Sequence, residues 1–252
     1  MLTKNERTNK SKKINTKKLF RKKACALTLM LSLALNIGTV STVNAFDETD
    51  TMNEIGQKIV VSTVIPIDEN DAEFNEKVLK EIEAQNLLEQ EIMRQIKQEE
   101  RAAYINSIIC DPNNISRVSG LKEDDYKLLT SGTWWEGNEQ TLIDLEKNYG
   151  VNAMFAMAVS TLESASGTSS RAKNRNNYYG LELSKVWNGL YSNTQYWGGL
   201  IAKSYIGQGR TSATSISTKY CPPNSSKWAS FVNSQMGVYY NKLISKLNDT
   251  EM

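Results

Sequence analysis

The stretch Val151–Gly180, which reads VNAMFAMAVSTLESASGTSSRAKNRNNYYG, decides the fold of this chain. Its first half predicts a helix, because apolar residues recur at i, i+3, i+4, i+7 and i+11: Val151, Met154, Phe155, Ala158 and Leu162. Gly167 and Ser169 then turn the chain into a short basic helix over 170–175. Residues 176–180 follow as a turn that is rich in side-chain donors and aromatic rings.

Glu163 lies where the first of these helices is expected to end. The negative end of the helix macrodipole disfavours a carboxylate there. The small residues below it, Ala156, Val159 and Ser160, form a mostly apolar floor that also disfavours the charged form. Both effects predict a raised pKa, which a carboxylic acid needs if it is to donate a proton near neutral pH. Glu163 is therefore the candidate general acid.

Several blocks of sequence, in this order, resemble the bacterial cell-wall endo-beta-N-acetylglucosaminidases of glycoside hydrolase family 73 (mannosyl-glycoprotein endo-beta-N-acetylglucosaminidase-like). The resemblance runs from about Ile105 to Leu247. It rests on Asp111-Pro112-Asn113, Val118–Leu121, Lys147–Asn152, Leu162-Glu163-Ser164, Gly167-Thr168-Ser169, Asn176-Asn177 before an aromatic residue and Gly180, Ser217–Tyr220 and Trp228-Ala229. It implies a glycoside hydrolase that cleaves the N-acetylglucosaminyl linkages of peptidoglycan.

The fold class follows from the same resemblance and from the sequence pattern. We expect an α+β fold that is mainly helical, with a lysozyme-like catalytic domain, a small irregular strand lobe and a long N-terminal helix before it. Helices are predicted over 121–129, 140–148 and 196–206, and a last helix is predicted to bury Trp228, Phe231, Val232, Tyr239 and Leu243. The strand lobe is expected within 181–199, which is rich in Gly, Asn, Ser and aromatic residues.

Four segments are predicted along the chain. Residues 1–45 have the features of a signal peptide: ten Lys and Arg before position 24, an apolar run, and Val43-Asn44-Ala45 as a cleavage site. The alternative is a retained anchor, but the apolar run is shorter than the ~18–20 residues that a span needs. A flexible mature N-terminus over 46–67, an acidic helical segment over 68–103 and a catalytic domain over 104–248 follow. We expect a secreted or cell-wall protein with no stable membrane span after cleavage.

Charge is distributed unevenly along the mature chain. Removal of the signal peptide leaves 20 basic and 27 acidic residues, while the part after Glu163 has 10 basic residues against three acids. A basic half suits an acidic polymer such as peptidoglycan or its attached anionic polymers, and a nucleic-acid partner is not expected. The helix over 68–101 lacks Gly and Pro and is either one helix or a pair. It can act as a spacer, mediate self-association, bind a protein partner, or lie against the catalytic domain.

The chain contains no histidine, which excludes Ser-His-Asp hydrolases, Cys-His peptidases and His-ligated zinc enzymes. We expect no metal and no cofactor. Cys110 and Cys221 remain after export, and either a disulfide between them or two buried free thiols fits the sequence.

A second catalytic group beside Glu163 has three candidate sources. Glu182 can supply it, acids before Glu163 can fold into the site, or the N-acetyl group of the substrate can be the nucleophile. We favour the last, with Tyr220 as a polar assistant, because the resemblance places that Tyr opposite the catalytic Glu. A core tyrosine bonded to backbone is the alternative for Tyr220, and a solvated surface acid is the alternative for Glu182.

The substrate-binding residues are expected around the turn that follows Glu163. The candidates for contact with sugar are Ser164, Asn177, Tyr178, Tyr179, Trp187 and Trp197, of which the four aromatic residues would form a cleft wall. Ser166 stands where the family often has an aromatic residue. Besides hydrolysis, two other functions fit the sequence: a lytic transglycosylase with the same single Glu, and a non-catalytic wall-binding or scaffold module.

Overall fold

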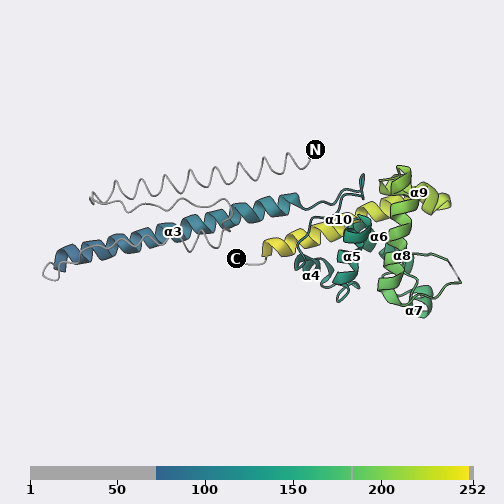
Figure 1. The fold of residues 1–252 in the computed structure, drawn as a ribbon, viewed down its shortest axis with the longest axis horizontal. Coiled ribbons are helices and arrows are strands. Elements are labelled where there is room, and N and C mark those ends of the chain that lie inside the picture. Colours follow the sequence, from purple (N-terminus) through teal and green to yellow (C-terminus); the bar gives the residue numbers. More distant parts are fainter. Residues whose placement is uncertain (1–71, 183, 250–252) are drawn as a thin grey trace. The chain divides into compact units, whose positions relative to one another are not determined.

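The computed structural model describes residues 72–182 and 184–249 (Figure 1). The predicted signal peptide and the mature N-terminus up to position 67 lie outside these residues. The chain divides after Asp71, and the described residues all belong to the second unit. Within them, no helix has the length and apolar character that crossing a membrane requires.

Helices account for all the regular structure in the described residues. In chain order they are α3 (Ala72–Ser107), α4 (Asp125–Thr130), α5 (Glu139–Tyr149), α6 (Ala153–Ser164), α7 (Ser170–Arg175), α8 (Gly189–Ser204), the 3₁₀ turn η1 (Ile206–Gln208), α9 (Ala213–Tyr220), the 3₁₀ turn η2 (Pro222–Asn224) and α10 (Ser225–Asp249). The mainly helical fold and the long helix that precedes the domain are confirmed.

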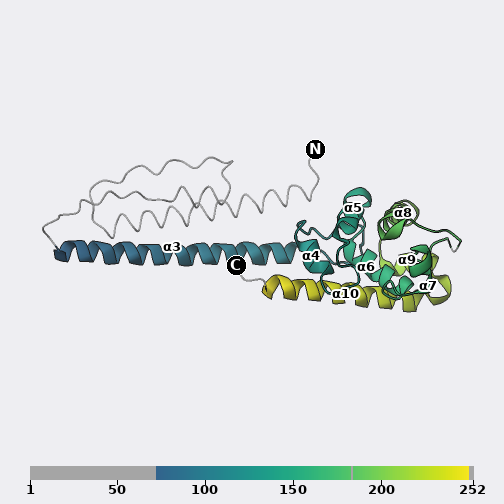
Figure 2. The same cartoon turned by 90° about the horizontal axis from the view of Figure 1, so that it is seen from below.

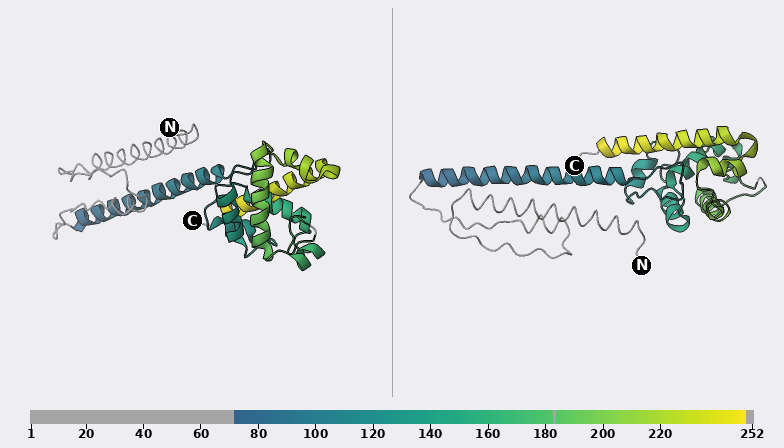
Figure 3. Two further views of the ribbon diagram at one scale, coloured as in Figure 1. Left: turned by 45° about the vertical axis from the view of Figure 1, so that its right-hand side comes forward. Right: turned by 90° about the horizontal axis from the view of Figure 1, so that it is seen from above.

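Helix α6 is the centre of the core. Every residue from Val151 to Ser160 is buried. The helix lies between α10 on one side and α5 with α8 on the other (Figures 2 and 3). Asn152 caps its first turn, accepting hydrogen bonds from the backbone N–H groups of Met154 and Phe155. The amide of Asn152 also donates to the carbonyls of Ile109 and Arg117, and this attaches the approach loop to the start of α6.

The N-terminal helix α3 is a single helix of 36 residues, about 54 Å long. It continues to Ser107, four residues past the predicted boundary at 103. The hydroxyl of Tyr104 in its last turns contacts Asp125 and accepts a hydrogen bond from the backbone N–H of Lys122 at 3.0 Å. Earlier in the helix, Leu79, Leu87 and Leu88 are exposed. The end of α3 is therefore part of the domain that follows it.

The expected strand lobe is not present in the described residues. Helix α8 starts at Gly189, seven residues before the predicted helix at 196, and buries Asn193, Thr194, Trp197, Gly198 and Ile201. A Cβ atom on Gly198 would lie 2.3 Å from Leu145 Cδ1 and 2.8 Å from Tyr149 Cδ2. Glycine is thus required for α8 to pack against α5, whereas in the sequence the same glycine suggested irregular structure.

Two smaller corrections concern other helices. Helix α4 begins at Asp125, so the predicted helix over 121–129 starts four residues too early. Phe231 is 39% exposed, although the pattern of α10 predicted that it would be buried. Trp228, Val232, Tyr239 and Leu243 are buried as predicted.

Candidate active site

Glu163 lies in the last turn of α6, as the sequence predicted. The chain reverses directly after it, because Ala165 and Ser166 adopt left-handed backbone conformations with φ of 50° and 54°. Ser164 is buried, donates from Oγ to the carbonyl of Ser160 and accepts from the N–H of Gly167 at 2.8 Å. Ser164 therefore builds the turn behind Glu163, and its hydroxyl is used within the protein.

The two oxygens of the Glu163 carboxyl group have different neighbours. Oε1 accepts a hydrogen bond of 2.8 Å from the indole Nε1 of Trp228 in α10. Oε2 lies against Gly180, where an added Cβ atom would be only 2.7 Å from it. Gly180 has a φ of 65°, which also favours glycine. The carboxyl group is thus held between α10 and the turn at Gly180.

Burial raises the pKa of Glu163 above its ordinary value of 4.5. The hydrogen bond from Trp228 and the positive charge of Arg171 act in the opposite direction, and burial outweighs them. The predicted direction of the shift is therefore confirmed. A carboxyl group in this setting keeps its proton to a higher pH than a solvated one does.

Tyr220, the last residue of α9, lies close to this carboxyl group. Its hydroxyl donates to the backbone carbonyl of Tyr179 at 2.5 Å and accepts from the indole Nε1 of Trp197 at 3.2 Å. Its ring centroid is 5.2 Å from that of Trp228. Burial, followed by the negative charge of Glu163, raises the pKa of Tyr220 well above the usual value. Tyr220 therefore stays protonated, and its single O–H holds the Tyr179–Gly180 peptide in place.

The two asparagines before the aromatic pair shape the turn. Asn177 is buried and accepts from the N–H of Leu181 at 3.0 Å, while its amide contacts the carbonyl of the same residue. Asn176 donates to the carbonyl of Trp187 at 2.9 Å. The N–H of Tyr178 donates to Asn193 Oδ1 at 2.7 Å, which connects the turn to α8.

The aromatic candidates separate into two groups. Tyr179 and Trp197 are fully buried and stack on each other, with ring centroids 4.3 Å apart, and Trp187 is also buried. The rings of Tyr179 and Trp197 belong to the core. The ring of Trp187 lies outside that cluster and is covered by Lys185 and Tyr196. Tyr178 is half-buried and stacks on Trp134 with centroids 5.6 Å apart and planes 17° apart. The indole N–H of Trp134 donates to Thr161 Oγ1 at 3.2 Å. Thr161 is two positions before Glu163 in α6, so the Trp134 ring lies near the end of that helix.

Glu182 lies on the surface. Its side chain accepts a hydrogen bond of 2.7 Å from the hydroxyl of Tyr196 and forms an ion pair with Lys185 at 3.9 Å. Among the acids that the structure describes between residues 76 and 162, Glu146 is the buried one. Five hydrogen bonds reach its carboxylate: two from the N–H of Ser119 at 3.0 and 3.1 Å, one from Ser119 Oγ at 2.9 Å, one from the hydroxyl of Tyr126 at 2.8 Å and one from the N–H of Ala153 at 2.7 Å.

Cys110 and Cys221 are free thiols in this structure, and both are half-buried. The thiol of Cys110 donates to the carbonyl of Met236 at 3.6 Å, and burial raises its pKa to about 11. Cys221 precedes the start of α10 at Ser225, and Met236 is eleven positions after that start, about 16 Å along the axis. Cys110 therefore lies near the middle of α10, whereas Cys221 lies before its start.

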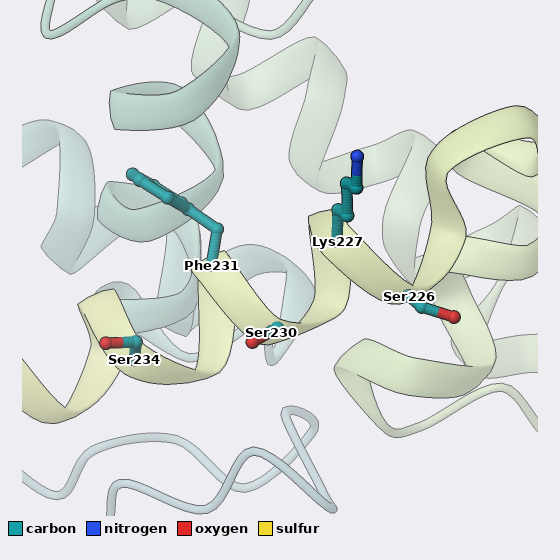
Figure 4. Close-up of a pocket in the computed structure, with 5 residues that line it drawn as sticks. All are labelled: Ser226, Lys227, Ser230, Phe231 and Ser234. Atoms are coloured by element: carbon teal, nitrogen blue, oxygen red, sulfur yellow. The ribbon is translucent and has the colours of Figure 1, made fainter.

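The described residues contain no group of three or more Cys, Asp or Glu side chains arranged to hold a metal ion. An open surface depression is lined by Ser226, Lys227, Ser230, Phe231 and Ser234 of α10 (Figure 4). Figure 4 shows Phe231 and Lys227 extending from the same side of that helix.

Three residues of the site were not predicted as site residues: Trp228, Gly180 and Trp134. Trp228 was assigned to the core, where its ring does lie, but its N–H reaches Glu163. The sequence feature that could have identified Trp134 as a site residue was its position beside Trp135 in a predicted loop. Gly180 belonged to the quoted turn, but the contact with Glu163 depends on the folding of α6 against that turn.

Comparison with known proteins finds a family model that matches the part of the chain containing this site. Residues 139–249 match the family model Glucosaminidase, described as mannosyl-glycoprotein endo-beta-N-acetylglucosaminidase. The match includes Glu163, Gly180, Tyr220 and Trp228, although it begins after the blocks between 105 and 121. It confirms the resemblance seen in the sequence, and with it the expectation of a glycoside hydrolase.

Among solved structures, the chain is similar to Autolysin E of S. aureus. For the complex with a muropeptide, the identity is 14%, the TM-score is 0.44, and the match covers 57% of this chain and 77% of that one. For a catalytic mutant in complex with the disaccharide NAG-NAM, the identity is 16% and the TM-score is 0.44, and the match covers 57% of this chain and 78% of that one. A comparison with curated protein sequences finds no significant match.

Proposed function

We propose, on the basis of the glucosaminidase domain over residues 139–249, that this chain is an exported N-acetylglucosaminidase that hydrolyses the glycan strands of peptidoglycan. The observation that carries the proposal is the setting of Glu163. Its carboxyl group is largely buried at the end of α6, its pKa is raised, and it has Trp228 as a hydrogen-bond donor. This is the environment that a general acid for glycosidic bond cleavage needs.

In the proposed mechanism, Glu163 gives its proton to the glycosidic oxygen that leaves. The carbonyl oxygen of the substrate's own N-acetyl group attacks the anomeric carbon as that bond breaks. The Glu163 carboxylate then takes a proton from the water molecule that opens the cyclic intermediate, and this restores the acid. Two observations support a nucleophile from the substrate: Glu182 is bonded to Tyr196 and Lys185 on the surface, and Glu146 is surrounded by donors in the core.

Two groups would assist this chemistry. The stacked pair Trp134–Tyr178 is half-buried near the end of α6, and aromatic faces of this kind stack on sugar rings. Tyr220 would act as a positioning residue, since its O–H already holds the carbonyl of Tyr179 next to Gly180. The basic residues after Glu163 favour an anionic polymer as substrate.

The proposal is tested by Glu163→Gln, which keeps the shape of the side chain but cannot transfer a proton in the same way. We expect digestion of purified peptidoglycan to fall by about 10²–10⁴-fold, with folding and peptidoglycan binding retained. Mass spectrometry of the wild-type products should show reducing N-acetylglucosamine ends. Anhydro sugars would instead indicate a lytic transglycosylase, and near-normal digestion by the variant would remove Glu163 from the mechanism.

Export and the limits of the catalytic unit are part of the same proposal. The basic start of the chain and the Val43-Asn44-Ala45 site support a mature protein that begins at Phe46, which N-terminal sequencing of the secreted protein would check.

A shortened chain that begins at Ala102 should fold and digest soluble glycan fragments within about threefold of the full rate, because every group of the proposed site lies after residue 130. It keeps Tyr104, which bonds to Asp125 and Lys122. A folded but inactive product would mean that α3 contributes to the site.

A further inference from the structure

The two oxygens of Glu163 are not equivalent, and we infer that Trp228 and Gly180 together place the transferable proton on Oε2. This inference rests on the proposed role of Glu163 as general acid. It adds two positioning residues and assigns a direction to the proton transfer. Its basis is the geometry on the two sides of the carboxyl group: a donor at Oε1 and a close backbone at Oε2.

Trp228 determines the state of Oε1. An indole N–H is a donor only, so the oxygen that it reaches at 2.8 Å must accept a hydrogen bond whether Glu163 is charged or neutral. In the neutral acid the carbonyl oxygen is the better acceptor, and the O–H therefore belongs on the other oxygen. The energy of one such bond favours this arrangement by on the order of 10-fold.

The indole of Trp228 has little freedom to turn away. Its side chain is 4% exposed, and its ring lies against Tyr220 at 5.2 Å and edge-on to Phe155 at 6.4 Å between centroids. The direction of its N–H is therefore set by the core of the domain. An immobilised donor gives a fixed orientation to the carboxyl group that it binds.

Gly180 controls the space around Oε2. An atom at the Cβ position would be 2.7 Å from Oε2 and 3.5 Å from the carboxyl carbon, so the carboxyl group occupies the place where a side chain would be. The turn cannot easily retreat, because the carbonyl of Tyr179 is held by Tyr220 and the N–H of Tyr178 is bonded to Asn193. Any side chain at position 180 would displace the carboxyl group from the position in which Oε1 accepts from Trp228.

The first test replaces Trp228 by 3-benzothienylalanine, which keeps the shape of the ring but has sulfur in place of the N–H. We expect kcat on soluble glycan fragments to fall about 10-fold with KM nearly unchanged. The alkaline limb of the pH–rate profile should also move to higher pH, because the N–H favours the charged carboxylate and its loss raises the pKa of Glu163. An unchanged kcat and an unchanged alkaline limb would overturn the inference.

The second test compares two glycines. Gly180→Ala and Gly150→Ala impose the same backbone strain, since φ is 65° and 62°, but a Cβ at position 150 has no atom within 4 Å. We expect kcat to fall about 100-fold or more for Gly180→Ala, and less than about threefold for Gly150→Ala. Equal activity of the two variants would overturn the role of Gly180. If Gly180→Ala does not fold, the Trp228 isostere alone decides.

The Glu163→Gln protein separates this inference from the proposed function. If Glu163→Gln is inactive while the Trp228 isostere behaves like wild type, Glu163 remains the acid and the inference fails alone. If Glu163→Gln keeps its activity, the proposed function fails, whatever the Trp228 and Gly180 variants do.

Discussion

Two glutamates mark the two ends of α6 and differ in what surrounds them. Glu146 belongs to α5 and is 8% exposed. Its carboxylate lies at the start of α6, where it accepts from Ala153 at 2.7 Å as well as from Ser119 and Tyr126. Glu163 lies at the end of the helix and accepts from Trp228. The helix dipole also favours a negative charge at the first position and disfavours it at the second.

The comparison teaches that burial alone does not make a carboxyl group an acid catalyst. Both side chains are withdrawn from water, but the donors around Glu146 replace the solvent that it lost. At Glu163 burial dominates, and the pKa rises. Glu146 thus serves to join the loop at Ser119 to α6. The raised pKa of Glu163 instead suits a group that has to release a proton.

The largest effect that would test this contrast is on stability. Glu146→Gln replaces one acceptor oxygen by an NH₂ group, although N–H groups approach both oxygens of the native side chain. We expect the free energy of unfolding to fall by about 2–3 kcal/mol, since at least one buried donor loses its partner. Urea unfolding followed by circular dichroism measures this. A loss below about 0.5 kcal/mol would mean that the donors around Glu146 are not needed.

A smaller effect of opposite sign is expected at the other end of α6. Because burial raises the folded-state pKa of Glu163, its contribution to stability is fully present below the ordinary value of 4.5 and is lost as pH rises through the folded pKa. Gln does not titrate. Glu163→Gln should therefore gain stability relative to wild type as pH rises from about 4.5, which thermal unfolding across pH 4–8 can follow. A difference that does not vary with pH would contradict the raised pKa.

The smallest effect is expected at Glu182, a third glutamate, which lies on the surface. It is exposed and engaged by Tyr196 and Lys185. Glu182→Gln should therefore change kcat by less than about threefold. A collapse of activity in a folded Glu182→Gln protein would instead make Glu182 the second carboxylate of a two-carboxylate mechanism.

The part of this site that depends on local sequence could be predicted. The helix over 153–164, its end at Glu163 and the raised pKa follow from periodicity and from small residues within one segment. The partners of Glu163 could not be predicted, because Trp228 is 65 positions away and meets it only when α10 packs on α6. The glycines of α8 led to a wrong prediction. Gly198 suggested irregular structure, whereas in the folded protein it allows α8 to pack closely against α5.

The left-handed residues behind Glu163 have a consequence for engineering. In the described chain, the non-glycine residues with positive φ are Ala165, Ser166 and Asn176, all within the segment that follows the acid. For Ala165 and Ser166 this conformation costs about 1–2 kcal/mol each, which glycine would avoid at some cost in the entropy of the unfolded chain. Ala165 and Ser166, two and three positions after Glu163, are therefore the first positions to replace by glycine when a more thermostable protein is wanted. A search for stabilising substitutions that is limited to the core would not include this turn.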